Sequence, residues 1–135
     1  EAQRLADQAG VLARMAAPKD LPADRAEAAK RVFQAMTAQP RLVSGRGRFD
    51  TLVMESAAGA VAVKTGAEGM YAGIVPGLGV GIALKIDDGA KRASETAMAA
   101  VLTLLGVIDL NPETPVLNAA GDEVGAVRMG ADWPG

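Results

Sequence analysis

The sequence predicts an α+β fold in which an antiparallel sheet packs against helices. Three short apolar segments, residues 59–64, 70–76 and 80–86, are joined by links rich in glycine, and links this short favour antiparallel neighbours. Helical patterns precede and follow these segments, and no internal repeat is visible. A chain of 135 residues is long enough to bury a core, so we expect a single domain over residues 1–135.

The helical lead-in, residues 1–40, should contain two helices. Residues 1–17 spread four large apolar side chains among alanines and charges, as an amphipathic helix does. Asp24 can cap the second helix, and Pro40 stops it. The stretch that follows, 49–55, fits either a short helix or a short strand.

After the sheet of residues 59–86, a helix is expected over 90–106. Asp88 can cap its start, and Gly106 suits its C-terminal end. One stripe of this helix should face the sheet; its members are Ala93, Ala97, Ala100, Val101, Leu104 and Leu105. The tail, residues 112–135, carries a turn at Ala120-Gly-Asp122 and fits a last hairpin.

Composition excludes several functions. The chain has no cysteine and no histidine, which removes disulfides, thiol catalysis, the commonest general base and the usual zinc ligands. Net charge is −2 with scattered basic residues, so no nucleic-acid partner is expected. No apolar run approaches the roughly 18 residues of a membrane span, and no signal peptide is visible. A cytoplasmic location without a membrane partner is therefore the expectation.

The most informative motif is Lys64-Thr-Gly66, at the end of an apolar run. A lysine in that setting is costly to bury and readily has its pKa lowered by desolvation, as a general base near neutral pH requires. Lys-Thr-Gly is also a signature of serine–lysine hydrolases. Without the flanking motifs, a surface lysine at a strand end is the preferred interpretation of Lys64; with them, the catalytic role is preferred.

Three motifs in register resemble the asparaginase II family, the bacterial class 3 L-asparaginases. They are Ser44-Gly-Arg-Gly-Arg-Phe-Asp-Thr51, Val63-Lys-Thr-Gly-Ala-Glu-Gly69 and Gly81-Ile-Ala-Leu-Lys-Ile-Asp-Asp-Gly89. The resemblance covers the C-terminal part of the family pattern. It implies a fold similar to the serine β-lactamases and penicillin-binding proteins, and hydrolysis of L-asparagine to aspartate and ammonia.

The resemblance implies a serine–lysine mechanism in which Lys64 is the second lysine. The nucleophile of the family lies in a Ser-x-x-Lys step, but the residues three places after Ser44, Ser56 and Ser94 are Gly47, Gly59 and Ala97. The nucleophile is therefore expected in an upstream segment. Some members bind zinc through cysteines and a lysine in that segment, so no cofactor is expected in this chain. Some members also have a cysteine where Asp50 stands here.

The substrate contacts follow from charge matching and from the motif. Backbone N–H groups beside Gly66 could donate to the substrate carbonyl, because glycine permits close approach. Thr65 either points away or binds the substrate carboxylate, and Ala67 belongs to the same segment. Arg46 or Arg48 could hold the α-carboxylate, and Glu68 could face the ammonium group.

Two other functions compete with this one. The chain could be a non-catalytic binding or assembly module, although its lead-in matches the interior of the family pattern. Thr65 could serve as nucleophile, but Lys64 points to the opposite face of a strand and could not activate it directly. A homodimer is expected from the family and from the apolar surface that a C-terminal segment would expose.

Overall fold

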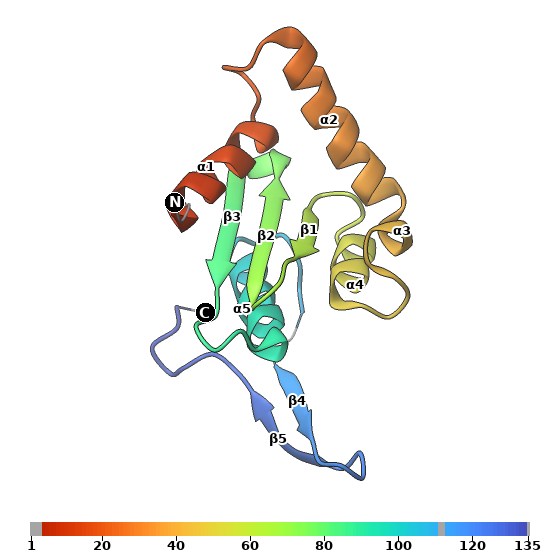
Figure 1. The fold of residues 1–135 in the computed structure, drawn as a ribbon, viewed down its shortest axis with the longest axis vertical. Helices are drawn as coiled ribbons and strands as arrows, with labels where there is room; N and C mark the ends of the chain where they lie inside the picture. The colour runs from red at the N-terminus through yellow and green to blue at the C-terminus, as the bar shows by residue number, and fades with distance from the viewer. Residues whose placement is uncertain (1–3, 111–112, 135) are drawn as a thin grey trace.

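The computed structural model describes residues 4–110 and 113–134, which contain the predicted succession of helices, three strands, a helix and a tail (Figure 1). The helices are α1 Leu5–Ala16, α2 Ala23–Ala38, α3 Pro40–Ser44, α4 Phe49–Ser56 and α5 Lys91–Leu104, with a 3₁₀ turn η1 at Pro76–Leu78. The strands are β1 Ala62–Thr65, β2 Met70–Val75, β3 Val80–Lys85, β4 Thr114–Leu117 and β5 Glu123–Val127. The ambiguous stretch after the lead-in is helical, as α4.

The three predicted strands form one antiparallel sheet in the order β1–β2–β3. Lys64 lies opposite Ala72, and the next pair is Thr65 opposite Tyr71. Successive residues of a strand point to opposite faces, so Lys64 and Thr65 face different sides of the sheet. Within the described residues, β1 is an edge strand, and this position matters for the site.

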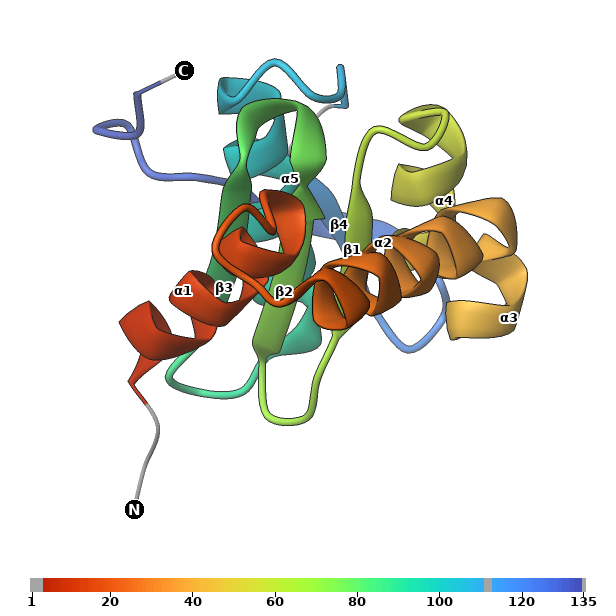
Figure 2. The same ribbon diagram turned by 90° about the horizontal axis from the view of Figure 1, so that it is seen from above.

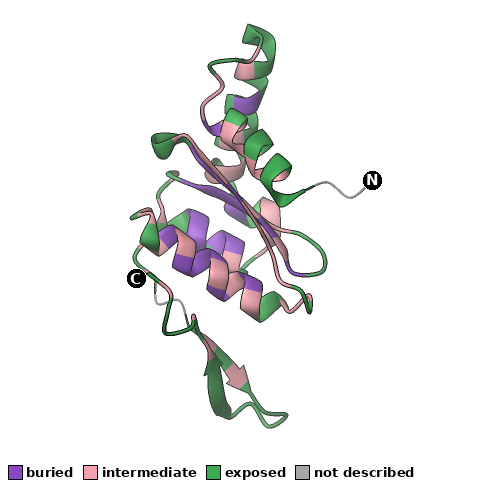
Figure 3. Ribbon diagram, turned by 90° about the vertical axis from the view of Figure 1, so that its left-hand side faces the viewer, coloured by how far each residue is buried: buried purple, intermediate pink, exposed green. Residues whose placement is uncertain are grey.

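One face of the sheet packs on α5 (Figures 2 and 3). Large side chains fill the space between them. Val63, Tyr71 and Ile82 come from the three strands and share a buried cluster with Met98 and Leu102 of α5. Phe49, which packs against this cluster, meets the Tyr71 ring edge to face. The core of the sheet therefore lies on its α5 side.

The other face of the sheet is covered by α1, which approaches it at backbone distance. A Cβ atom at Gly81 would lie 2.2 Å from the Ala13 nitrogen and 2.3 Å from the Ala9 oxygen. No other residue fits there, because only glycine leaves this space empty. Of the four large apolar side chains of the predicted helix, Leu12 and Met15 are partly buried, whereas Leu5 and Val11 are exposed.

The predicted stripe of α5 is wrong in part. Ala100 is buried, but Leu104 is half-exposed, whereas Ser94 and Thr96 are buried. Helix α5 has a second neighbour besides the sheet, since Thr96 Oγ1 lies 2.7 Å from Thr114 Oγ1 of β4. Burial on several sides removes the single stripe that the pattern assumed.

The helix ends confirm one prediction and correct two. Gly106 ends α5 as expected: its N–H donates to Thr103, and the next N–H, of Val107, donates to Leu102. Asp24 lies inside the first turn of α2 and is not its cap. Asp88 accepts from the Ala90 N–H at 2.8 Å, but α5 itself starts without a side-chain cap.

The tail forms the predicted hairpin, in which β4 and β5 pair beside the main body. Asn118 closes its turn by accepting from the N–H groups of Ala120 and Asp122. Residues 111, 112 and 135, which belong to the predicted link and tail, lie outside the described residues. Over the described part of the chain, no helix has the length and apolarity that crossing a membrane requires.

Candidate functional site

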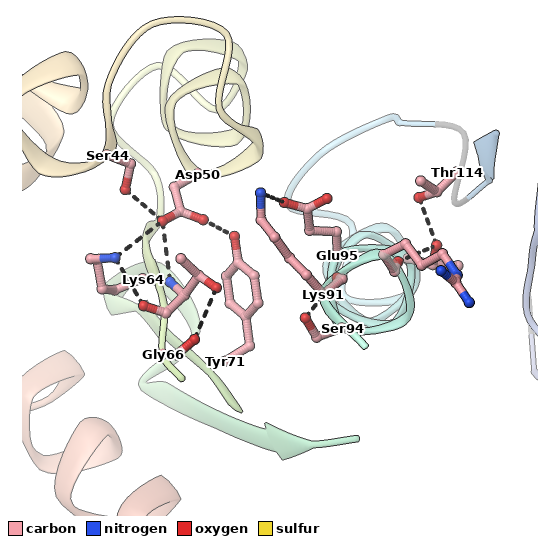
Figure 4. A network of polar contacts seen from close by, with 12 residues as sticks. Ser44, Asp50, Lys64, Gly66, Tyr71, Lys91, Ser94, Glu95 and Thr114 are labelled. Carbon is pink, nitrogen blue, oxygen red and sulfur yellow. Dashed lines mark hydrogen bonds and ion pairs between the residues drawn. The ribbon is translucent and has the colours of Figure 1, made fainter. Parts of the chain in front are cut away.

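A buried carboxylate, Asp50, organises the edge of the sheet (Figure 4). It stands in the first turn of α4 and is 2 % exposed. Its Oδ2 accepts from Ser44 Oγ at 2.5 Å and from the Thr65 N–H at 3.1 Å, and its Oδ1 accepts from the Tyr71 hydroxyl. Lys64 Nζ lies 3.7 Å from Oδ2. We call these five residues the Asp50 cluster.

The cluster is a satisfied polar site inside an apolar core. Burying a carboxylate is costly unless hydrogen bonds and an opposite charge replace its water. Both oxygens of Asp50 receive donors, and no buried side-chain polar atom of the described residues lacks a partner. The three donors come from α3, β1 and β2, so one side chain fixes three elements relative to one another.

Lys64 is not buried as the apolar run suggested. Its side chain is 47 % exposed, because β1 lies at the edge of the described sheet and Lys64 is on the face opposite the core. Its Nζ donates to the Thr65 carbonyl at 2.8 Å and pairs with Asp50. The ammonium group is therefore accessible to solvent and held from one side by fixed protein atoms.

A small pocket on the α5 side of β1 gathers four of the predicted substrate-binding residues. It has a volume of about 140 Å³, and its wall contains Arg48, Thr65, Gly66 and Glu68. Gly69, Gly89, Lys91 and Ser94 complete the wall. We call it the polar pocket. Thr65 connects it to the Asp50 cluster, since its backbone N–H and C=O contact Asp50 and Lys64.

Other predicted site residues lie outside this wall. Arg46 and Ala67 are exposed and do not line the polar pocket, and Lys64 does not line it either. The N–H of Gly66 itself donates to the Met70 carbonyl at 2.9 Å and so closes the turn between β1 and β2.

The turn between β1 and β2 holds Glu68 in an unusual conformation. Its φ is +54°, in the left-handed region that residues with a side chain rarely adopt. A Cβ atom at the adjacent Gly69 would lie 3.0 Å from the Gly89 Cα, so the turn is packed against the start of α5. This packing fixes the backbone of Glu68 in the wall of the polar pocket.

A larger cavity of about 580 Å³ lies between α4, α5 and β4. Arg48 and Lys91 line both this cavity and the polar pocket. Most of the remaining wall is apolar, with Phe49, Leu52, Ala99, Leu110 and Pro115. We call it the apolar cavity.

Sequence reasoning missed several of these residues. Asp50 and Ser44 stand in the first family motif, but no local pattern indicates that Asp50 contacts a lysine 14 positions later. Lys91 and Ser94 follow the third motif at the start of α5, and only the tertiary fold brings them to the polar pocket. In the sequence, Tyr71 looks like any aromatic residue of a strand. Only the structure shows that its hydroxyl donates to Asp50.

The chain has no cysteine or histidine, and the described residues contain no group of three or more acidic side chains placed to hold a metal ion.

Comparison with known proteins identifies one family. A model of the L-asparaginase II family matches residues 2–129. A search of curated proteins found no match. The matched region includes both cavities and every residue of the Asp50 cluster.

Proposed function

The chain belongs to the L-asparaginase II family, and from that premise we propose that it carries the lysine-bearing part of a serine–lysine amidohydrolase that acts on L-asparagine. The family indicates an asparaginase-like activity. The observation that carries the finer proposal is the setting of Lys64: an accessible ammonium group held by a buried carboxylate and a backbone carbonyl. A group that transfers protons needs both access to substrate and a fixed position.

In the proposed reaction, a serine oxygen attacks the carbon of the side-chain amide. Lys64 takes part in moving the serine proton to the amide nitrogen, which leaves as ammonia when the C–N bond breaks. Water then cleaves the acyl ester and releases aspartate. Asp50 acts as a positioning residue, because it contacts Lys64 and Thr65 and has no access to the substrate.

The nucleophile in this proposal comes from polypeptide beyond the 135 residues. Each serine hydroxyl of the chain donates to a group other than Lys64: Ser44 to Asp50, Ser56 to Val53, and Ser94 to Lys91. We assign to the same upstream polypeptide the β-lactamase-like remainder of the fold and the zinc ligands of those relatives that have them.

The polar pocket is the proposed site for the α-amino-acid end of asparagine. Arg48 lies in its wall and offers a fork of donors that matches a carboxylate. Glu68 lies in the same wall and offers the opposite charge for the ammonium group. Lys64 points to the other face of β1, but its Nζ reaches the strand edge at the Thr65 carbonyl, and the side-chain amide would react there.

Exposed apolar side chains near the site support completion by further polypeptide, including a second copy in a homodimer. Leu42 on α3 is 85 % exposed, only two positions from Ser44 of the Asp50 cluster. Leu117 and Val124 of the hairpin are also exposed. Large apolar side chains in such positions are typical of contact surfaces.

The test is ammonia release from L-asparagine by this chain and by the chain extended at its N-terminus. We expect activity only in the extended protein. Lys64→Met should abolish it, and Lys64→Arg should not restore it, because arginine keeps the charge but cannot release a proton near neutral pH. Lys19→Met, an exposed lysine away from the site, is the control.

Two results would contradict the proposal. Turnover by the 135-residue chain alone would place the nucleophile within it. Full activity of Lys64→Arg in the extended protein would mean that Lys64 contributes charge and no proton transfer.

A further inference from the structure

The polar pocket and the apolar cavity share two wall residues, Arg48 and Lys91. These two cations therefore stand at the boundary between a small polar space of about 140 Å³ and a larger one of about 580 Å³. Glu68 lines only the polar pocket. An α-amino acid whose ammonium group faces Glu68 would turn its carboxyl end toward Arg48 and Lys91, and hence toward the apolar cavity.

The apolar cavity has the size and composition of a ligand site. Pockets that bind small organic molecules are typically about 300–1,000 Å³, mainly apolar, with a few polar groups that fix orientation. The apolar part of the wall includes Phe49, Leu52 and Leu110. Arg48 and Lys91 are the charged groups that could orient a ligand. Free asparagine has no apolar part that could use this surface.

The charged residues around the apolar cavity leave Arg48 available for an anionic group of a ligand. Lys91 Nζ pairs with Glu95 at 3.1 Å, and Glu113 adds a second carboxylate to the wall. Arg48 has no ion pair among the described residues and remains available for an anion. Because Arg48 lines both spaces, it can meet a carboxylate on either side of the boundary.

We propose that the apolar cavity accepts an apolar residue joined to the α-carboxyl group of asparagine, so that the substrates include asparaginyl dipeptides such as asparaginyl-leucine. This inference rests on the proposed amidohydrolase function. The reaction is unchanged: the serine attacks the side-chain amide carbon, the C–N bond breaks and ammonia leaves, and water then cleaves the acyl ester to release an aspartyl dipeptide. The peptide bond is not cleaved.

The test is calorimetric binding to the 135-residue chain, which does not depend on turnover. Asparaginyl-leucine should bind at least about tenfold more tightly than asparagine, because the burial of its leucine side chain adds a favourable term that asparagine lacks. Asparaginyl-glutamate, of similar size but charged, should show no such gain.

A substitution in the cavity wall locates the effect. Leu52 is 51 % exposed, so Leu52→Gln should fold normally and reduce the preference for asparaginyl-leucine several-fold, with asparagine binding unchanged. Leu42→Gln makes the same change at an exposed position that lines neither space. It should leave both affinities as they are.

The outcomes separate this inference from the function on which it rests. If Lys64→Met keeps its ammonia release in the extended protein, the proposed function fails, whatever binds in the cavity. The inference itself is overturned if asparaginyl-leucine binds no more tightly than asparagine, if neither binds, or if Leu52→Gln weakens both ligands equally.

Discussion

The two faces of the three-stranded sheet pack against their helices in different ways. On the α5 side, large side chains such as Tyr71, Met98 and Leu102 fill the space between helix and sheet. On the α1 side, Gly81 lets helix and strand meet at backbone distance. The first face should therefore be damaged by removing atoms and the second by adding them. Lys64 belongs to the second face but lies at the sheet edge, half exposed.

The largest effect should come from shortening a side chain on the α5 face. Leu102→Ala removes a fully buried side chain and should lower the free energy of unfolding by about 2–5 kcal/mol, through lost burial and the cavity left behind. Urea denaturation measures this. Leu104→Ala, two positions along the same helix but half exposed, should cost below about 1 kcal/mol. Equal costs would mean that the face of α5 has been assigned wrongly.

On the α1 face, adding a single methyl group should be enough to destabilise the protein. Gly81→Ala places its Cβ against the α1 backbone and should cost about 3 kcal/mol, the upper end for overpacking, because backbone cannot move aside as a side chain can. Gly77→Ala is the matched control, since no atom lies within 4 Å of its Cβ position. A Gly81→Ala protein as stable as the control would contradict the close approach.

The Asp50 cluster connects the core face to the sheet edge, and Tyr71 tests that connection. Tyr71→Phe keeps the ring in the core but removes a hydrogen bond to a buried carboxylate, which should cost about 1.5–3 kcal/mol. Equilibrium unfolding at constant pH measures the loss. A cost below about 0.5 kcal/mol would show that this hydroxyl does not support Asp50.

The smallest effect on stability should come from Lys64. Lys64 is half exposed although Asp50 is buried, and Asp50 keeps its three hydrogen-bond donors without Lys64, so losing this ion pair should cost about 0–1 kcal/mol. Lys64→Met should therefore unfold almost as the original protein does, while the extended protein loses its ammonia release. A large loss of stability would instead make Lys64 a structural residue, and the activity result would no longer identify its role.

The sequence predicted the strands well because local signals decide them. Gly69 and Gly79 lie in the links between the apolar segments, and both adopt positive φ in the turns. The helix faces were predicted less well, because a periodic pattern does not reveal how many neighbours a helix has. Leu104 of α5 fits the apolar stripe but is exposed, whereas Ser94 fits no stripe and is buried.

The candidate site was predicted in its segments but not in its organisation. Charge matching brought Arg48 and Glu68 together, and both line the polar pocket. The burial expected for Lys64 was wrong, because an apolar run preceding a lysine does not indicate whether its strand lies at an edge. Asp50 was missed as the organising residue, since its partners come from three separate elements.

The hydrogen bond from the Thr65 N–H to Asp50 also bears on self-association. An edge strand with free backbone donors is a template on which another chain can add a strand, and natural proteins block such edges with charges or covering segments. Asp50 occupies one of these donors, and Lys64 places a charge beside it. Replacing Asp50 should therefore expose a pairing edge as well as disturb the site, so its variants should form intermolecular β-structure at concentrations where the original chain remains dispersed.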